Sequence, residues 1–494
     1  MLYTFYTTHL IMQILKFIVS VCFLLTCTVT THAAIIVVND PTDNGQIDGL
    51  CDLRDALYSA SINISVDACT AGQSGVQDIV IIQVPGPIQL NSTIAVFGAV
   101  TVATNIGAPA VEIKAANERR HFRVSPNSFE DSNFSMANLI LSGGNATSDN
   151  GGAISFVSVN SRFERIELTD MVFLNNHATI GGALSLDNVN ANHVSIINSE
   201  FINNTAASFA GAIYGERLVL PGSSATSLTL NNNLFLNNHS SNNVGAVYIG
   251  NQGGNEFNTE MIGNVYIGNT ATEDIGALHI NGIITPWNIS ISNNLWLFNQ
   301  SSDQAGAIFV SSAVISTLSN SVIAFNQARI GGGILARFDD ALINLYHSTV
   351  IHNSATSSGD NIYVYGDARI TSQSNVIAYP RHGDNCSGLL GTNLSSSRNN
   401  LVDDMSCEML SSTSLLSIAD PHLSGFSSSD DYFPGFQPTA ASPALDNSEC
   451  SLLVDAIGNS RPNDGDGNGL AFCDMGGLEA PSNTDLIWSD AFGL

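Results

Sequence analysis

Positive charge is scarce in this sequence. Its only lysines are Lys16 and Lys114, and Lys and Arg together number 15 against 43 Asp and Glu in 494 residues. A surface this acidic repels nucleic acid and anionic lipid, which excludes both as partners. Neutral glycans, basic partners and metal cations are compatible with the charge. A simpler interpretation also stands, because net charge alone keeps a secreted protein soluble.

Long hydrophobic runs are also missing. The apolar run "FIVSVCFLLTCTV", residues 17–29, is shorter than the about 20 residues that cross a bilayer as a helix, and no later segment is long enough. The run follows Lys16 and precedes "TTHA", which offers small residues to a signal peptidase. Residues 1–33 are therefore predicted to be a cleaved signal peptide. The alternative is a lipoprotein signal with Cys27 acylated, although Thr26 is unfavourable before such a cysteine.

Cysteine is absent from the middle of the chain. An even number of cysteines follows the signal peptide, which in an oxidising compartment indicates disulfides. Six cysteines allow 15 pairings, and closeness along the chain favours the neighbouring pairs. These pairs are Cys51 with Cys69, Cys386 with Cys407, and Cys450 with Cys473. No C-x₂-C spacing occurs, which argues against a zinc site.

The middle of the chain repeats one motif. "FLNNHATIGGALSL" at 173–186 returns as "FINNTAASFAGAIYG" at 201–215. The glycine before the apolar residues recurs from Gly152 to Gly333 in steps of 30, 29, 34, 31, 30 and 27 residues. An asparagine three residues after an aromatic or aliphatic residue keeps the same interval: Asn176, Asn204, Asn238, Asn269, Asn299, Asn326 and Asn353. Such a period indicates a solenoid or a propeller.

The spacing of apolar residues separates these two architectures. After each glycine the apolar positions lie two apart, which is the period of a strand and excludes helical solenoids. A propeller blade needs about 40–45 residues, more than this period supplies. Three short strands fit in one repeat, and successive coils stack about 4.8 Å apart. We therefore predict an all-β fold, a right-handed parallel β-helix over residues 78–380, with disulfide-stapled N- and C-terminal segments.

Stacking explains the repetition itself. Each side chain lies above its counterpart in the previous coil, so asparagine amides can form a hydrogen-bonded ladder and aromatic rings can stack in the core. Glycine permits the positive φ of a tight turn. The asparagine and glycine ladders, with His177 and His239 beside them, are accordingly expected to be structural rather than catalytic.

The repeats and both ends resemble known secreted proteins. "FLNN" with "GGAL", 173–184, resembles the repeats of the polymorphic outer-membrane protein family, whose β-helices are implicated in adhesion. "CDLRDAL", 51–57, is similar to the CSLREA-type N-terminal segment of secreted bacterial β-helix proteins. "SPALDNSEC", 442–450, and "DAIGNSRPNDGDGNGLAFCDMGGLE", 455–479, resemble the choice-of-anchor region of that group. The resemblance implies an N-terminal cap at 34–77, a C-terminal region at 381–480 and a short tail at 481–494.

Enzymes on the same scaffold are the main alternative. Pectate lyases and polygalacturonases are β-helices that use a basic residue beside bound Ca²⁺ or paired carboxylates. The candidates here are Asp339 and Asp340 after Arg337, and a cluster of Arg119, Arg120 and Arg123. No GHG or RIK tripeptide accompanies them.

A calcium loop is the most specific local pattern. In "DGDGNG", 464–469, Asp464, Asp466 and Asn468 alternate with glycine as in the first half of a calcium-binding loop, but the twelfth position is Met475 instead of glutamate. A plain turn is the competing interpretation. No cofactor is required otherwise.

The function predicted from these patterns is non-catalytic. We expect a monomeric, secreted or cell-surface β-helix that presents a long face for adhesion or glycan contact. A polysaccharide lyase or glycoside hydrolase on the same scaffold is the alternative. A face of Asn, Ser and Thr would favour the binding protein, whereas a groove with Arg, Asp and aromatic residues would favour the enzyme.

Overall fold

The computed structural model describes residues 32–126, 132–158, 161–217, 226–251, 257–282, 287–312, 314–338, 340–388, 394–407, 413–425 and 436–481. Residues 1–31 of the predicted signal peptide and 482–494 of the predicted tail lie outside this part. Within it, no helix is long and apolar enough to cross a membrane.

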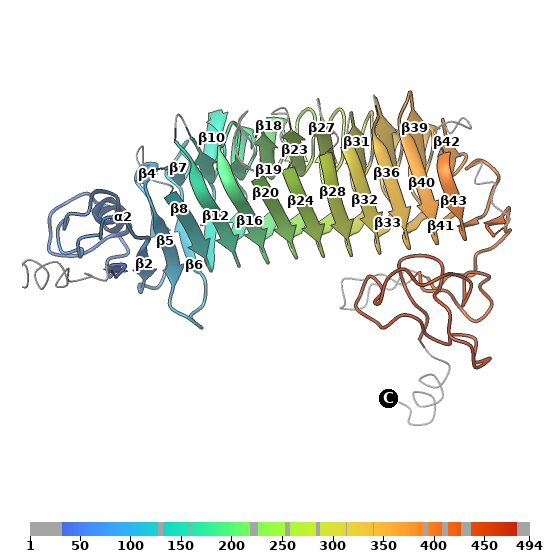
Figure 1. Cartoon of the computed structure of the whole chain (residues 1–494). Coiled ribbons are helices and arrows are strands. Elements are labelled where there is room, and N and C mark those ends of the chain that lie inside the picture. Colours follow the sequence, from blue (N-terminus) through green and yellow to red (C-terminus); the bar gives the residue numbers. More distant parts are fainter. Residues whose placement is uncertain are drawn as a thin grey trace, which may run out of the picture.

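Four parallel sheets run along the rod (Figure 1). Sheet A contains β1 (Ile35–Val38), β2 (Asp78–Ile82), β5 (Val100–Thr104), β8 (Ser132–Ala137), β12 (Phe163–Thr169), β16 (Ala191–Ile197), β20 (Thr226–Asn231), β24 (Phe257–Ile262), β28 (Trp287–Ser292), β32 (Val314–Ser319), β36 (Leu342–Tyr346), β40 (Arg369–Gln373) and β43 (Leu394–Arg398). Sheet B contains β3 (Ile88–Gln89), β6 (Val111–Lys114), β9 (Leu139–Ser142), β13 (Val172–Leu174), β17 (Glu200–Ile202), β21 (Leu234–Leu236), β25 (Val265–Ile267), β29 (Leu295–Leu297), β33 (Val322–Ala324), β37 (Thr349–Ile351), β41 (Val376–Ala378), β44 (Leu401–Val402) and β45 (Leu415–Leu416).

The other two sheets are shorter. Sheet C contains β4 (Ile94–Phe97), β7 (Phe122–Ser125), β11 (Ile154–Phe156), β15 (Leu184–Ser185), β19 (Ile213–Glu216), β23 (Val247–Asn251), β27 (Leu278–Gly282), β31 (Ile308–Ser311), β35 (Ile334–Arg337), β39 (Ile362–Tyr365) and β42 (Cys386–Ser387). Sheet D contains β10 (Asn145–Asn150), β14 (His177–Ile180), β18 (Thr205–Phe209), β22 (His239–Ser240), β26 (Thr270–Ala271), β30 (Gln300–Ser301), β34 (Gln327–Ile330) and β38 (Ser354–Ser358).

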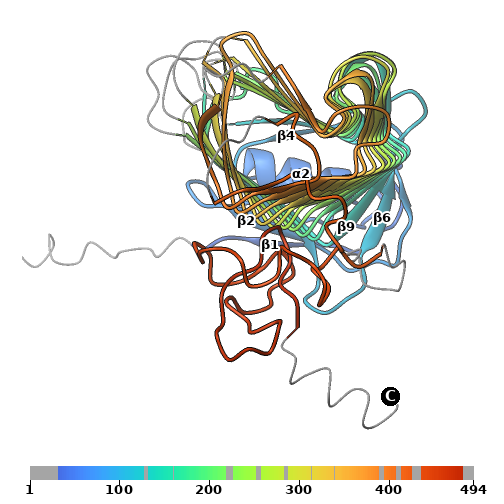
Figure 2. The ribbon, with the colours of Figure 1, turned by 90° about the vertical axis from the view of Figure 1, so that its right-hand side faces the viewer.

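The predicted parallel β-helix is confirmed, with one strand more per coil than expected. Each coil passes through sheets A, B, D and C in turn, and the fourth, short strand in sheet D appears from β10 onward. Figure 2, seen along the rod, shows this part as a hook that folds back beside the main coil. Glycine permits the fold, because a Cβ on Gly182 would clash with the carbonyl oxygen of Gly211 in the next coil.

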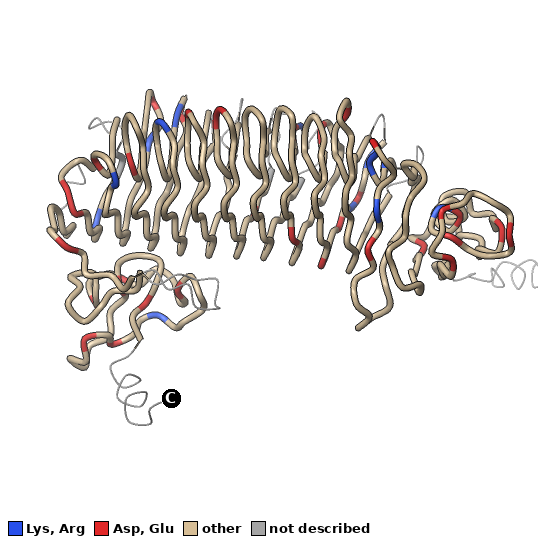
Figure 3. The backbone as a smooth tube through the Cα atoms, turned by 180° about the vertical axis from the view of Figure 1, so that it is seen from behind, with Lys and Arg blue, Asp and Glu red and all other residues tan. Residues whose placement is uncertain are grey.

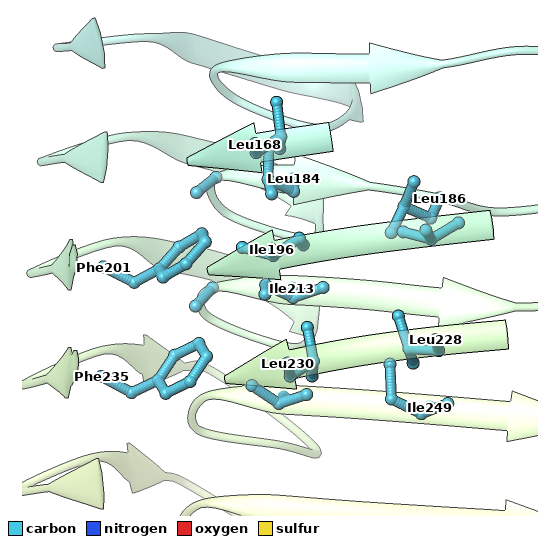
Figure 4. Close-up of a cluster of buried hydrophobic side chains, with 14 of the residues drawn as sticks. Leu168, Leu184, Leu186, Ile196, Phe201, Ile213, Leu228, Leu230, Phe235 and Ile249 are labelled. Atoms are coloured by element: carbon cyan, nitrogen blue, oxygen red, sulfur yellow. The ribbon is translucent and has the colours of Figure 1, made fainter. Parts of the chain in front are cut away.

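The core is a set of columns that run along the rod. Inward side chains of sheets A, B and C stack coil upon coil, as Figure 4 shows for the middle of the rod. In sheet B the rings of Phe173, Phe201, Phe235, Tyr266 and Trp296 lie nearly parallel, with centroids 4.7, 5.0, 4.7 and 5.4 Å apart. A second, smaller apolar cluster fills the hook and includes Tyr214, Tyr248 and Phe309.

A helix covers the N-terminal end of the rod. Helix α2 (Leu53–Ile62) begins after Asp52, whose side chain caps it by accepting from the amide of Asp55. Leu53 and Leu57 on its buried face belong to the main core, so the open end of the solenoid is closed.

The C-terminal segment, residues 436–481, folds back along the outside of the rod (Figure 1). Phe436, Ala444 and Met475 pack on outward side chains of sheet B, and the amide of Gly477 donates to Thr349 Oγ1 at 3.0 Å. The three predicted disulfides, Cys51–Cys69, Cys386–Cys407 and Cys450–Cys473, are all present. Strands β42, β43, β44 and β45 extend the sheets beyond residue 380.

Candidate functional site

The repeated asparagines form one buried ladder. All seven predicted residues, Asn176, Asn204, Asn238, Asn269, Asn299, Asn326 and Asn353, are fully buried. Asn238 is typical: its Nδ2 donates to Asn269 Oδ1 and to the carbonyl of Phe201, both at 2.9 Å. Each amide thus ties its own coil to both neighbours, which is a structural role.

A second ladder, at the turn between sheets A and B, was not recognised from the sequence. It consists of Ser199, Asn233, Asn264, Asn294, Ser321, Ser348, Asn375 and Asn400, all buried. Asn233 Nδ2, for example, donates to Asn264 Oδ1 at 3.0 Å. In most coils an asparagine or serine stands two residues before the inward residue of sheet B, and this regular position could have revealed the ladder.

The outer face of sheet A is a long polar surface. In register along it lie Thr229, Glu260, Ser290 and Thr317. Over β20, β24, β28 and β32 the surface is hollowed, with a volume of about 480 Å³. Most of the lining residues carry a hydroxyl or amide group, beside Leu228, Ile289 and Ile315. Glu260, held by a hydrogen bond from Asn231, is the only charged residue among them.

A small pocket contains the predicted arginine cluster. Arg119, Arg120 and Arg123 surround a volume of about 180 Å³ together with Glu118 and Asp149. Arg120 is only 7% exposed and forms an ion pair with Asp149. Burial lowers the pKa of the Arg120 guanidinium, and the charge of Asp149 opposes this shift.

The other predicted catalytic group is not assembled into a site. Asp339 lies outside the described residues. Asp340 is exposed and faces Arg369 at 3.7 Å, while the guanidinium of Arg337 lies over the ring of Phe338. The described groups therefore show an isolated surface pair rather than two carboxylates facing one cleft.

A pair of carboxylates does occur elsewhere, on neighbouring coils of sheet C. Asp187 follows β15 and Glu216 ends β19, in positions that stack on each other. Burial, and then the charge of Glu216, raise the pKa of Asp187. The hydroxyl of Tyr214 donates to Glu216 Oε2. Sequence reasoning missed this pair because the two residues are 29 positions apart and belong to no motif.

The predicted calcium loop gains a third carboxylate from outside. Oxygens of Asp446, Asp464 and Asp466 lie within 4.8 Å of one another. Burial raises the pKa of Asp446, and the charges of Asp466 and Asp464 add to the rise. Asn468 instead donates its Nδ2 to Asp466 Oδ2 at 2.7 Å. The carboxylate repulsion and the oxygen donors suit a hard cation.

Asp474 and Glu479, the other acids near the loop, belong to a different cluster. Both are buried around Arg461, whose Nε lies 3.4 Å from Glu479 Oε2. Burial raises the pKa of Asp474 to about 6 and that of Glu479 to about 7. The Asp474 carboxylate accepts from the amides of Asp446 and Ala480, and neither acid is part of the group of three carboxylates around the loop.

Comparison with known proteins leaves the chain without a family. No family model matches it, and no curated protein matches it in sequence. Among solved structures, the crystal structure of pectate lyase Pel9A is similar at 13% identity, with 92% of this chain and 98% of that chain covered and a TM-score of 0.37. A similarity this distant carries no argument about activity.

Proposed function

We propose that the protein is a secreted or surface-associated, non-catalytic β-helix that binds a neutral glycan on the outer face of sheet A. The observation that carries the proposal is the hollow over β20, β24, β28 and β32. Its exposed side chains, among them Asn258, Asn288 and Ser290, are hydrogen-bonding groups spaced at the coil repeat. A polymer of sugar hydroxyls can pair with such an array without a buried charge.

The composition of the hollow argues against catalysis there. Hydrolysis of a glycosidic bond uses two carboxylates, and elimination uses a basic side chain. The lining contains one carboxylate, Glu260, and no Lys or Arg. The surface thus fits the expectation of an Asn, Ser and Thr face rather than that of a cleavage groove.

Binding to a panel of neutral polysaccharides tests the proposal. The double variant Asn288→Ala/Ser290→Ala should lose binding measured by isothermal titration, and no reducing ends or unsaturated products should form. The matched control is Gln300→Ala/Gln327→Ala, because both glutamines are exposed on sheet D, on another face. Equal loss of binding in both double variants would contradict the proposal. So would the absence of binding by the unmodified protein.

A second candidate function, glycoside hydrolysis, is favoured by the Asp187–Glu216 pair. The raised pKa of Asp187, which stacks beside the carboxylate of Glu216, suits a general acid. Release of reducing sugar from any polysaccharide, abolished by Glu216→Gln and by Asp187→Asn, would establish it. Release that persists in both variants would place catalysis elsewhere.

We further propose that the protein is exported and that it binds calcium. Three disulfides are consistent with an oxidising compartment, and the signal segment at 1–33 supports secretion. We also propose that the Asp446–Asp464–Asp466 cluster holds a structural Ca²⁺ that steadies the C-terminal segment.

A further inference from the structure

The arginine pocket lies where the coil changes shape. Sheet D begins at its edge strand β10, and the preceding coil passes from β6 to β7 without a strand there. Arg119 takes the place of the missing strand, since its carbonyl accepts from the amide of Asn145 at 2.8 Å, just as Gly144 accepts from His177 one coil later. This step between two kinds of coil leaves the recess that becomes the pocket.

The pocket has positive charge that the described residues do not balance. Asp149 pairs with Arg120 but is itself 66% exposed, so solvent weakens the pair. Among the described residues, Arg119 and Arg123 form no ion pair. Three arginines against Glu118 and Asp149 make the lining net +1, in a chain whose net charge is −28. Figure 3 shows how sparse Lys and Arg are along the middle coils.

We propose that the Arg119–Arg120–Arg123 pocket binds one oxyanion group of an acidic sugar. Guanidinium groups hold carboxylate and sulfate oxygens through paired, charge-assisted hydrogen bonds. A volume of about 180 Å³ admits one such group with part of its sugar ring rather than a chain of them. The negative charge of the whole chain repels polyanions, which favours a ligand that carries a single charge.

The site is separate from the hollow on sheet A. The proposal rests on glycan binding for the nature of the ligand, but the pocket is built from the edge of sheet D and from β7. Variants of Asn288 and Ser290 should therefore leave it unchanged, so the two proposals can fail independently.

Titration of the full chain with galacturonate, galactose, acetate and sulfate at low ionic strength tests the pocket. We expect galacturonate to bind and to raise the melting temperature, galactose to have no effect at this site, and acetate and sulfate to bind more weakly. Arg119→Gln/Arg123→Gln should weaken galacturonate binding at least about tenfold. Arg329→Gln/Arg369→Gln, which removes two exposed arginines elsewhere, is the control.

A third variant has the opposite expected sign. Asp149→Asn removes the carboxylate that competes for Arg120, so the free protein should melt at a lower temperature and galacturonate should stabilise it more than it stabilises the unmodified chain. Equal binding by the unmodified chain and the double arginine variant would overturn the proposal, as would weaker binding by Asp149→Asn. Acetate and sulfate binding as tightly as galacturonate would overturn the acidic sugar as ligand.

Discussion

At the scale of single residues, the corners of the coil show how stacking overrides backbone preference. The corner between sheets B and D has positive φ in every coil, and asparagine such as Asn237 tolerates it. Later coils place bulky aromatic residues there, although these rarely adopt such angles. Their rings stack 5.1, 5.1 and 4.8 Å apart: Phe298, Phe325, His352 and Tyr379. Phe436 of the C-terminal segment packs against this column. The strained corner thus forms part of the surface to which the C-terminal segment is attached.

The asparagine ladder yields a prediction at the same scale. Asn238→Ala should lower the free energy of unfolding by roughly 1–3 kcal/mol, because the carbonyl of Phe201 and the neighbouring amides lose a buried partner. Thermal and denaturant unfolding measure the change. Asn258→Ala, at an exposed position in β24, should be nearly neutral. An unchanged melting temperature for Asn238→Ala would mean that the ladder contributes little.

At the scale of elements, short segments acquire their chemistry from one another. The loop at 464–469 supplies two carboxylates, and the third, Asp446, lies before Cys450 on the other side of the Cys450–Cys473 disulfide. The amide of Asp466 donates to Asp446 Oδ2 at 2.9 Å, which holds the two segments together. Preformed contacts of this kind reduce the entropy cost of assembling a cation site.

The calcium proposal predicts a stabilisation that depends on this loop. Ca²⁺ in the range of about 10⁻⁴–10⁻³ M should raise the melting temperature, since an incomplete ligand set suits weak extracellular affinity. Asp466→Ala and Asp446→Ala should each abolish the rise. Asp48→Ala, a carboxylate at the opposite end of the chain, should leave it intact. A rise of the same size in all four proteins would place the ion elsewhere.

At the scale of the whole molecule, a buried polar cluster joins the C-terminal segment to the rod. His347, fully buried, accepts through Nδ1 from Arg461 Nη1 at 2.9 Å. Burial, and then the charge of Arg461, lower the pKa of His347 to about 3. Glu479 and Asp474 face the same arginine, and burial raises their pKa values to about 7 and about 6. For both carboxyl groups, burial thus outweighs the opposing charge of Arg461.

The attachment of the C-terminal segment should accordingly depend on pH in both directions. An unfolded histidine gains its proton near pH 6.5, so the folded state loses stability as the pH falls from about 6.5 toward 3. Glu479 acts oppositely: its raised pKa means that stability is lost as the pH rises from about 4.5 through 7. Protection of residues 436–481 against hydrogen exchange, taken relative to the intrinsic exchange rate at each pH, should be greatest between about pH 4.5 and 6.5, where the two effects offset each other. His347→Gln should reduce the acid-side loss, and His193→Gln should not; identical profiles for both variants would contradict this account.

The sequence by itself determined the β-helix and its period, and it favoured the disulfide pairs that the structure contains. In a solenoid each residue contacts its counterpart about one repeat away. The interval between Asn204 and Asn238 therefore already indicates that their side chains are in contact. The same holds for the stacked rings of Phe173, Phe201 and Phe235. Periodicity thus converts tertiary neighbours into a pattern that can be read along the sequence.

The tertiary structure decided everything that breaks the period. The hook of sheet D, the step that leaves the arginine pocket, the approach of Asp446 to the calcium loop and the contact of Arg461 with His347 join segments at irregular separations. Such contacts depend on how side chains and turns pack in three dimensions, and no repeat interval encodes them. The proposed binding sites lie at these irregular places and on the face of sheet A, whose hollow shape also arises only when the coils are stacked.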